Sequence, residues 1–185
     1  MTTSDESLIA DARRIMIIGG PGSGKSTLAL ALGDRLGLPV FHIDHLIWAR
    51  NWTERDLESR TREALEIEAQ EAWIFEGGGA ATFENRLARA DVLIWLDAPV
   101  MTRVWRLIRR AWRWRGQARP DMAEGCVERL NADWLGFLKW AWDTRKEREE
   151  EGAALMAKAG SRGIRLTSLA AINRFVDRVP DRSTG

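Results

Sequence analysis

Glycines, a lysine and hydroxyl side chains gather in one short segment near the start of the chain. The segment reads Gly19, Gly20, Pro21, Gly22, Ser23, Gly24, Lys25, Ser26 and Thr27. It matches the pattern G-x-x-x-x-G-K-[ST] at every fixed position. Glycines let backbone N–H groups approach phosphate oxygens, Lys25 supplies a cation for the β and γ phosphates, and the Ser26 hydroxyl can bind Mg²⁺. The pattern predicts a nucleoside triphosphate site, and its alternative is a glycine-rich turn without a ligand.

Acids that follow apolar runs are candidates for the rest of the chemistry. Asp44 is either a general base that orients an acceptor hydroxyl or a helix N-cap, and it could also share a metal site with His42 and His45. Glu76 ends another apolar run and could hold Mg²⁺ through water. Asp97 ends a third and is either a second magnesium carboxylate or a helix cap. We expect these acids at the carboxyl ends of parallel strands, where ligands bind.

Three consecutive glycines follow Glu76, and they are Gly77, Gly78 and Gly79. They either leave room for a substrate against the backbone or only form a tight turn.

An arginine-rich segment follows Asp97. Between Ala98 and Pro120 there are seven arginines and no acid. Helical spacing places one group of arginines opposite an apolar group. The arginines are Arg103, Arg106, Arg110 and Arg113, and the apolar residues are Val104, Leu107, Ile108 and Ala111. Three interpretations stand: a lid over the nucleotide, a solvated face, or a surface for nucleic acid with interleaved tryptophans.

Apolar runs and helical periodicities alternate along the chain. Strands are expected at 14–18, 39–43, 73–75, 92–96 and 164–166. Helices are expected at 26–36, 53–70, 83–89, from Pro99 onward, at 127–159 with a break near Gly152, and at 168–179. The alternation predicts an α/β fold, a three-layer α/β/α sandwich around a parallel sheet.

Length and composition set the broad class. The chain has 185 residues, a net charge of +1 and one cysteine, Cys126. We expect a single domain at 13–179, with flexible ends at 1–12 and 180–185. The near-zero net charge argues against a general nucleic-acid coat. The unpaired cysteine and the lack of a long apolar run indicate a cytoplasmic protein with no membrane partner.

Several segments together resemble the adenylate-kinase and shikimate-kinase branch of P-loop kinases. Within it, the chain most resembles the adenylate-kinase-like proteins related to DNA topology modulation. The matching segments are GPGSGKSTLA, LGLPVFHIDHLIW, WIFEGG, DVLIWLDAP, RLIRR and RPDMAEGC.

The resemblance implies a P-loop NTPase fold, a five-stranded sheet in the order 2-3-1-4-5 and a helical lid at about 112–125. It places Asp44 at the acceptor hydroxyl, Glu76 at Mg²⁺ in preference to Asp97, and Arg106 and Arg110 over the phosphates. It places the three glycines after Glu76 on the substrate side, and adenine beside Thr167 and Ser168. His42 stands where shikimate-type kinases carry a magnesium-site acid.

The expected function is transfer of the γ-phosphate of ATP, with Mg²⁺, to an unidentified small acceptor. The catalytic residues would be Lys25, Asp44, Arg106 and Arg110. One alternative is a P-loop NTPase with a nucleotide-responsive role in binding DNA and modulating its topology, and another is an NTPase without an acceptor. The partners expected are a nucleoside triphosphate and a small molecule, with nucleic acid less favoured.

Overall fold

A parallel sheet forms the centre of the protein. The computed structural model describes residues 3–78, 80–117, 125–127 and 130–182. The sheet consists of β1 (Arg14–Gly19), β2 (Val40–His42), β5 (Trp73–Glu76), β6 (Val92–Leu96) and β7 (Gly163–Leu166). Its order is β2-β5-β1-β6-β7 with all neighbours parallel. Numbered among themselves along the chain, these strands run 2-3-1-4-5, as predicted. The labels differ because an antiparallel ribbon, β3 (Trp48–Ala49) and β4 (Thr53–Glu54), takes two numbers.

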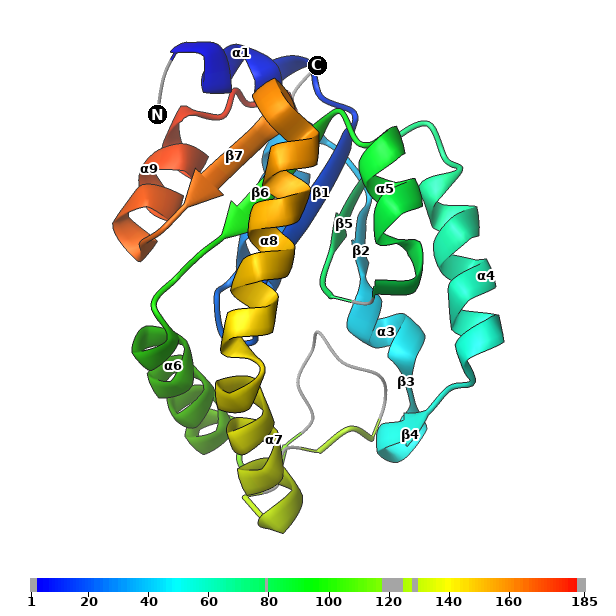
Figure 1. Ribbon diagram of the computed structural model, residues 1–185, viewed down its shortest axis with the longest axis vertical. Coiled ribbons are helices and arrows are strands. Elements are labelled where there is room, and N and C mark those ends of the chain that lie inside the picture. The colour runs from blue at the N-terminus through cyan, green and yellow to red at the C-terminus, as the bar shows by residue number, and fades with distance from the viewer. Residues whose placement is uncertain (1–2, 79, 118–124, 128–129, 183–185) are drawn as a thin grey trace.

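Helices cover both faces of the sheet (Figure 1). They are α1 (Thr3–Asp11), α2 (Lys25–Leu36), α3 (Ile43–Ile47), α4 (Leu57–Glu68), α5 (Phe83–Arg89), α6 (Val100–Arg113), α7 (Ala132–Asp143), α8 (Arg145–Ala159) and α9 (Leu169–Arg178). Short 3₁₀ turns are η1 (Arg50–Trp52), η2 (Ala80–Thr82) and η3 (Gly160–Arg162). The chain is therefore the three-layer sandwich that the alternation predicted.

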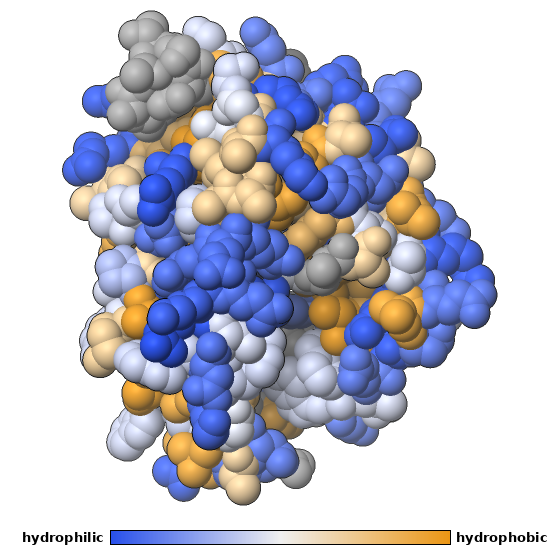
Figure 2. All heavy atoms as spheres, viewed as in Figure 1, coloured by the Kyte–Doolittle hydropathy of each residue, from blue (hydrophilic) through white to orange (hydrophobic). Residues whose placement is uncertain are grey.

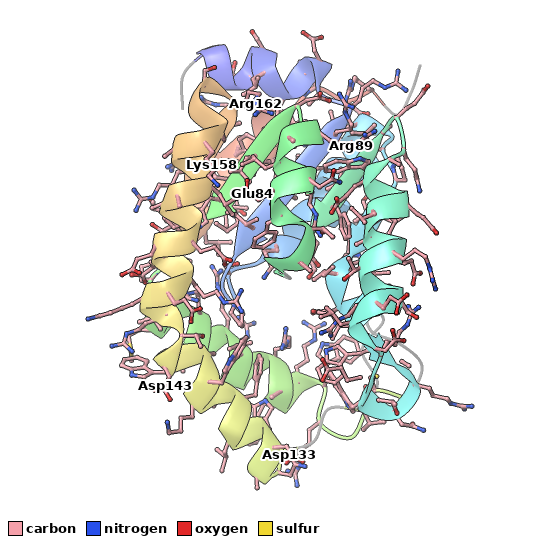
Figure 3. The ribbon with its side chains drawn as sticks, turned by 45° about the vertical axis from the view of Figure 1, so that its right-hand side comes forward. Glu84, Arg89, Asp133, Asp143, Lys158 and Arg162 are labelled. Atoms are coloured by element: carbon pink, nitrogen blue, oxygen red, sulfur yellow. The ribbon has the colours of Figure 1, made fainter. Side chains whose placement is uncertain are left out.

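The two layers of helices have separate cores. Along β1, Ile15 and Ile17 pack into one core and Met16 and Ile18 into the other, because successive side chains of a strand point to opposite faces. The first core joins the sheet to α1, α2 and α9, and the second joins it to α3, α4, α5 and α8. Figure 3 shows Lys158 of α8 beside Glu84 of α5, and their ion pair links these two helices at the surface.

The N-terminal segment is ordered against the core, contrary to the expectation of a flexible start. Thr3–Asp11 forms α1, and Ile9 is fully buried in the first core. Burying such a side chain contributes about 2 kcal/mol toward holding this helix against the core. At the other end, the Arg182 N–H donates to the Arg35 carbonyl at 2.6 Å and its guanidinium to the Ala12 carbonyl at 3.0 Å. Residues 183–185 lie outside the described part of the chain.

Helix boundaries differ from the prediction at several positions, including the start of α4 and the break between α7 and α8. Asp56, and not Thr53, caps α4, because its carboxylate accepts from the Ser59 N–H at 2.8 Å while Thr53 lies in β4. The break between α7 and α8 falls at Thr144 and not near Gly152. Gly152 lies inside α8 against the indole of Trp95, so its small size serves packing rather than a turn.

The segment expected to form a lid is only partly described. α6 ends at Arg113, and residues 118–124 lie outside the described residues. Beyond them, Cys126 is buried, and its sulfur accepts from the Trp52 N–H at 3.4 Å. The Trp52 indole donates to the Val127 carbonyl at 3.1 Å. The end of this segment is thus fixed to the β3–β4 ribbon.

The surface carries mainly hydrophilic side chains on the face that Figure 2 shows. Within the described residues, every helix is too short or too polar to cross a bilayer.

Candidate functional site

The glycine-rich segment forms a tight loop between β1 and α2. Gly19, Gly22 and Gly24 have φ values of 147°, 77° and 102°. A side chain is strained in this left-handed region, so glycine is required at these turns. The loop ends where α2 begins at Lys25, which places backbone N–H groups and the positive end of the helix dipole at one point. The ammonium of Lys25 donates to the Gly20 carbonyl at 3.3 Å.

Ser26 and Glu76 meet beneath this loop. The Ser26 hydroxyl donates to Oε1 of Glu76 at 2.9 Å, and Nδ1 of His42 lies 2.7 Å from the same oxygen. Burial alone would raise the pKa of Glu76, which is 3% exposed, but the hydrogen bond from His42 and the charge of Lys25 outweigh it. The pKa of Glu76 therefore lies below its ordinary value, and its carboxylate is charged at neutral pH.

These groups suit Mg²⁺, which prefers hard oxygen ligands and takes only one or two from the protein in nucleotide sites. The Ser26 hydroxyl and the Glu76 carboxylate converge and supply such oxygens. Asp97, the other predicted magnesium candidate, is paired with Arg165 at 2.9 Å. Among the described residues no three His, Cys, Asp or Glu side chains form a metal site, which is against the alternative built on His42, Asp44 and His45.

Arginines of α6 contact the phosphate loop. Arg106 donates to the Ser23 carbonyl at 3.0 Å, and Arg110 lines the cavity beside the loop. Arg103 is only 5% exposed and donates from Nε to the Ala98 carbonyl at 3.0 Å. The inner face of α6 is thus rich in arginine.

The predicted apolar face of α6 is therefore only partly correct. Leu107 and Ala111 are buried, but Ile108 is 41% exposed and Val104 is half-buried. The backbone carbonyls of the loop and of Ala98 accept hydrogen bonds, so arginine is accommodated where an apolar contact was expected. Arg113 is exposed, as a residue on the solvent side.

A cavity of about 680 Å³ opens beside the loop, between the ends of the strands and helices α6 and α7. Asp44, from the first turn of α3, lines it together with Gly77 and Gly78. The predicted acceptor-side residues therefore lie in one cavity with Lys25 and Ser26. Gly79 lies outside the described residues.

The lining of this cavity also includes residues that the sequence motifs did not single out. They are Trp48, Glu54, Arg60, Phe137, Trp140 and Arg148. The Arg148 guanidinium lies over the Trp140 ring, 5.4 Å from its centre, and it would be 3.1 Å from a Cβ at Gly78. Phe137 and Trp140 stack with ring centres 5.8 Å apart. In the sequence, the only signal for these residues is the helical spacing of aromatic residues along 134–142. That spacing does not indicate which part of the fold they contact.

A buried ion pair lies next to the turn that begins at Gly77. Nε of Arg86 lies 2.9 Å from Oε1 of Glu68, and both side chains are fully buried. Arg86 also reaches the Gly77 carbonyl at 3.4 Å. Burial lowers the pKa of Arg86 below its ordinary value, although the bond and charge of Glu68 oppose the change. Through Arg86, this pair connects α4 and α5 to Gly77, which lines the cavity.

Thr167 and Ser168 lie at the end of β7 and are exposed. The Ser168 hydroxyl caps α9 by accepting from the Ala171 N–H at 3.1 Å. Neither residue is among those that line the cavity beside the loop.

No family model matches the chain. The chain is 29% identical over 119 residues to threonine synthase-like 1 of Mus musculus. That match covers 56% of this chain and 16% of the relative, so the chain spans only a small part of that protein's length. It is also 34% identical over 138 residues to cytidylate kinase of Halorubrum lacusprofundi, covering 64% of this chain and 66% of the relative.

The fold is similar to that of shikimate kinase from Acinetobacter baumannii, whose structure contains shikimate. The TM-score is 0.56 at 19% identity, over 93% of both chains. The phosphate loop and the sheet order are those expected from the resemblance, and two of these similar proteins are named as kinases. The chain is similar in sequence and in fold to P-loop kinases of the adenylate-kinase and shikimate-kinase type.

Proposed function

We propose that the protein transfers the γ-phosphate of ATP to a hydroxyl group of a small anionic molecule. The observation that carries this proposal is the shared cavity, in which the phosphate loop faces Asp44 and two further arginines, Arg60 and Arg148. A donor site and an acceptor site on opposite walls of one cavity suit direct transfer between bound reactants.

The residues divide the work as follows. Lys25 and the loop N–H groups hold the β and γ phosphates, and adenine lies toward the end of β7 near Thr167 and Ser168. Arg106 and Arg110 stabilise the charge that spreads over the transferring group. Ser26 and Glu76 would hold Mg²⁺, which would supply positive charge to the phosphate oxygens.

Asp44 accepts a hydrogen bond from the acceptor hydroxyl and takes its proton during transfer. The acceptor oxygen forms the new bond to phosphorus, and the bond from phosphorus to the bridging oxygen of ADP breaks. The aromatic rings of the cavity wall exclude water, which would otherwise hydrolyse ATP.

The acceptor is anionic because two guanidinium groups lie on its side of the cavity. Arg60 pairs with Glu54 at 2.7 Å, and Arg148 lies 3.6 Å from Glu151. Both pairs are partly exposed and easily exchanged for a ligand. An arginine fork binds a carboxylate or a phosphate through parallel hydrogen bonds. A small hydroxylated carboxylate or a nucleoside monophosphate meets these requirements.

The test is a screen of hydroxy acids, nucleosides and nucleoside monophosphates for acceptor-stimulated release of ADP. One class should raise the rate well above that of ATP alone. Lys25→Met should abolish turnover while leaving the melting temperature within a few degrees of wild type. Asp44→Asn should lose transfer but retain ATP binding. ADP release that no acceptor stimulates would show an NTPase without an acceptor.

A second candidate is contact with nucleic acid through the outer face of α6. Trp105 and Trp112 are 57% and 70% exposed, and Arg109 lies over the Trp105 ring at 5.5 Å. Exposed Trp and Arg side chains can stack on bases. Arg103 and Arg106, however, are engaged by the phosphate loop and Ala98. DNA affinity with a steep salt dependence that falls in Trp105→Ala with Trp112→Ala would support this role, and salt-independent affinity would refute it.

A further inference from the structure

Gly20 is small for a reason unlike that of the other loop glycines. It occupies a variable position of the G-x-x-x-x-G-K-[ST] pattern, and its φ lies outside the left-handed region. A Cβ at Gly20 would lie 1.7 Å from Nη1 of Arg103 and 2.8 Å from its Cζ. The backbone of Gly20 thus tolerates a side chain, and only the guanidinium of Arg103 excludes one.

Arg103 brings α6 into direct contact with the loop. Its side chain is buried, and Nε is anchored on the Ala98 carbonyl at 3.0 Å, just before α6 begins. A Cβ at Gly22 would lie 2.5 Å from the backbone oxygen of Arg103 and 3.0 Å from Cγ of Leu107. The absence of a side chain at Gly20 and at Gly22 therefore allows the first two turns of α6 to pack directly against the loop.

The burial of Arg103 is electrostatically costly. Desolvation lowers the pKa of its guanidinium below the ordinary value, while the carboxylates of Glu149 and Asp97 oppose that change. A buried cation of this kind adds little net stability, because the cost of its desolvation offsets its attraction to these two carboxylates. We therefore look for the role of Arg103 in how it positions α6, and not in the stability of the fold.

We propose that Arg103 is a positioning residue that sets the distance between α6 and the phosphate loop. Its guanidinium fills the space left by Gly20, and it lies on the same side of α6 as Arg106 and Arg110, one and two turns further along. A rigid helix carries this placement to both arginines, which line the cavity beside the loop. The catalytic consequence rests on the proposed function, whereas the coupling of Arg103 to Gly20 does not.

The test is a double-mutant cycle with Gly20→Ala, Arg103→Ala and the combined variant. Melting temperature without nucleotide and the dissociation constant of Mg·ATP, by calorimetry, are the two quantities measured. Gly20→Ala should weaken ATP binding about tenfold in the wild-type background, because the new methyl group displaces Arg103 and with it α6. In the Arg103→Ala background the same change should cost about twofold or less.

Gly37→Ala is the matched control. Gly37 caps α2 in a left-handed conformation, with a φ of 64°, and a methyl group added there would meet nothing within 4 Å. This change should lower the melting temperature equally in both backgrounds and leave ATP affinity unchanged. Arg103→Ala itself should lower kcat more than it raises the KM for ATP, since it misplaces residues that act on the transferring group.

The outcomes separate the two proposals. Coupling in both melting temperature and ATP affinity supports a positioning role. Coupling in melting temperature alone would reduce Arg103 to a packing contact, and additive effects in both quantities would overturn the contact as well. If wild-type protein bound no ATP, the proposed function would fail, and the melting cycle would still decide whether Arg103 and Gly20 are coupled.

Discussion

The hydroxyl of Ser26 donates a hydrogen bond to Oε1 of Glu76 at 2.9 Å, and this bond joins the start of α2 to the end of β5. The start of α2, directly after the phosphate loop, is therefore in contact with the acid that ends the neighbouring strand. His42 fixes the same carboxylate oxygen from β2, so that three elements hold Glu76 in place.

Glu76→Gln should raise the Mg²⁺ concentration needed for half-maximal activity by about tenfold or more, because an amide is a poorer magnesium ligand than a carboxylate. ATP binding measured in EDTA should change much less. Calorimetric titration with and without Mg²⁺ separates the two effects. An unchanged Mg²⁺ requirement would show that Glu76 does not act on the metal.

Arg148→Met should raise the KM of the stimulating acceptor by about tenfold or more, since it removes a charge-assisted hydrogen bond from the acceptor side of the cavity. The KM for ATP should stay within about twofold. Arg145→Met is the control, because Arg145 lies over the Trp142 ring and does not line the cavity. Equal effects of the two changes would contradict an acceptor-binding role for Arg148.

The phosphate loop and the strands of the sheet could be predicted because they depend on local signals, whereas the order of the strands was implied by the family resemblance. Fully apolar runs such as Val92–Leu96 are bounded by turns and acids, and the strand matches its predicted range at both ends. The motif also fixes the loop between β1 and α2. The residues placed by these local signals, including Lys25, Ser26 and Glu76, line the cavity beside the loop.

Long-range packing explains what the sequence did not reveal. Helical spacing shows which residues of α6 share a face, but not which face meets the protein, and so it left open whether Arg103 faces the nucleotide, solvent or nucleic acid. Arg148 reaches the cavity only because α8 returns past the sheet, and no spacing along the chain encodes that distance. The helix expected from residue 53 begins only at Leu57, because Thr53 pairs with Ala49 in the ribbon.

Asp91 should make stability depend on pH in the acid range. Its carboxylate accepts from the N–H groups of Arg13 and Arg14 at 3.0 and 2.8 Å and pairs with the Arg14 guanidinium at 2.9 Å. Burial opposes ionisation, but these bonds outweigh it and lower the pKa of Asp91 below the usual 3.8. A depressed pKa stabilises the fold above pH 3.8, and the contribution is lost as pH falls through the folded-state value.

Asp91→Asn should therefore cost about 1 kcal/mol at pH 7, allowing for solvent screening of a side chain that is partly exposed. The difference from wild type should narrow as pH falls below 3.8. Urea unfolding at several pH values measures it. A difference that stayed constant down to about pH 2 would show that the charge of Asp91 plays no part.

The buried pair of Glu68 and Arg86 should be sensitive to removal of either partner. Arg86→Met leaves the Glu68 carboxylate buried and uncompensated, which costs about 3–5 kcal/mol in unfolding free energy. Glu68→Gln combined with Arg86→Met should cost less than Arg86→Met alone, because no charge remains buried. Denaturant unfolding of Arg86→Met and of the double variant measures both free energies of unfolding. A double variant less stable than Arg86→Met would contradict this explanation.

Gly152 and Gly136 provide a matched comparison of two helical glycines. A Cβ at Gly152 would lie 2.5 Å from Cε2 of Trp95, whereas one at Gly136 would meet nothing within 4 Å. Gly136→Ala should leave stability unchanged or raise it by up to about 1 kcal/mol, because alanine favours helix more than glycine does. Gly152→Ala should instead lower it by about 1–3 kcal/mol, since Trp95 must move within the second core. Thermal unfolding distinguishes the two, and a gain in stability at both positions would show that α8 can shift away from the sheet without cost.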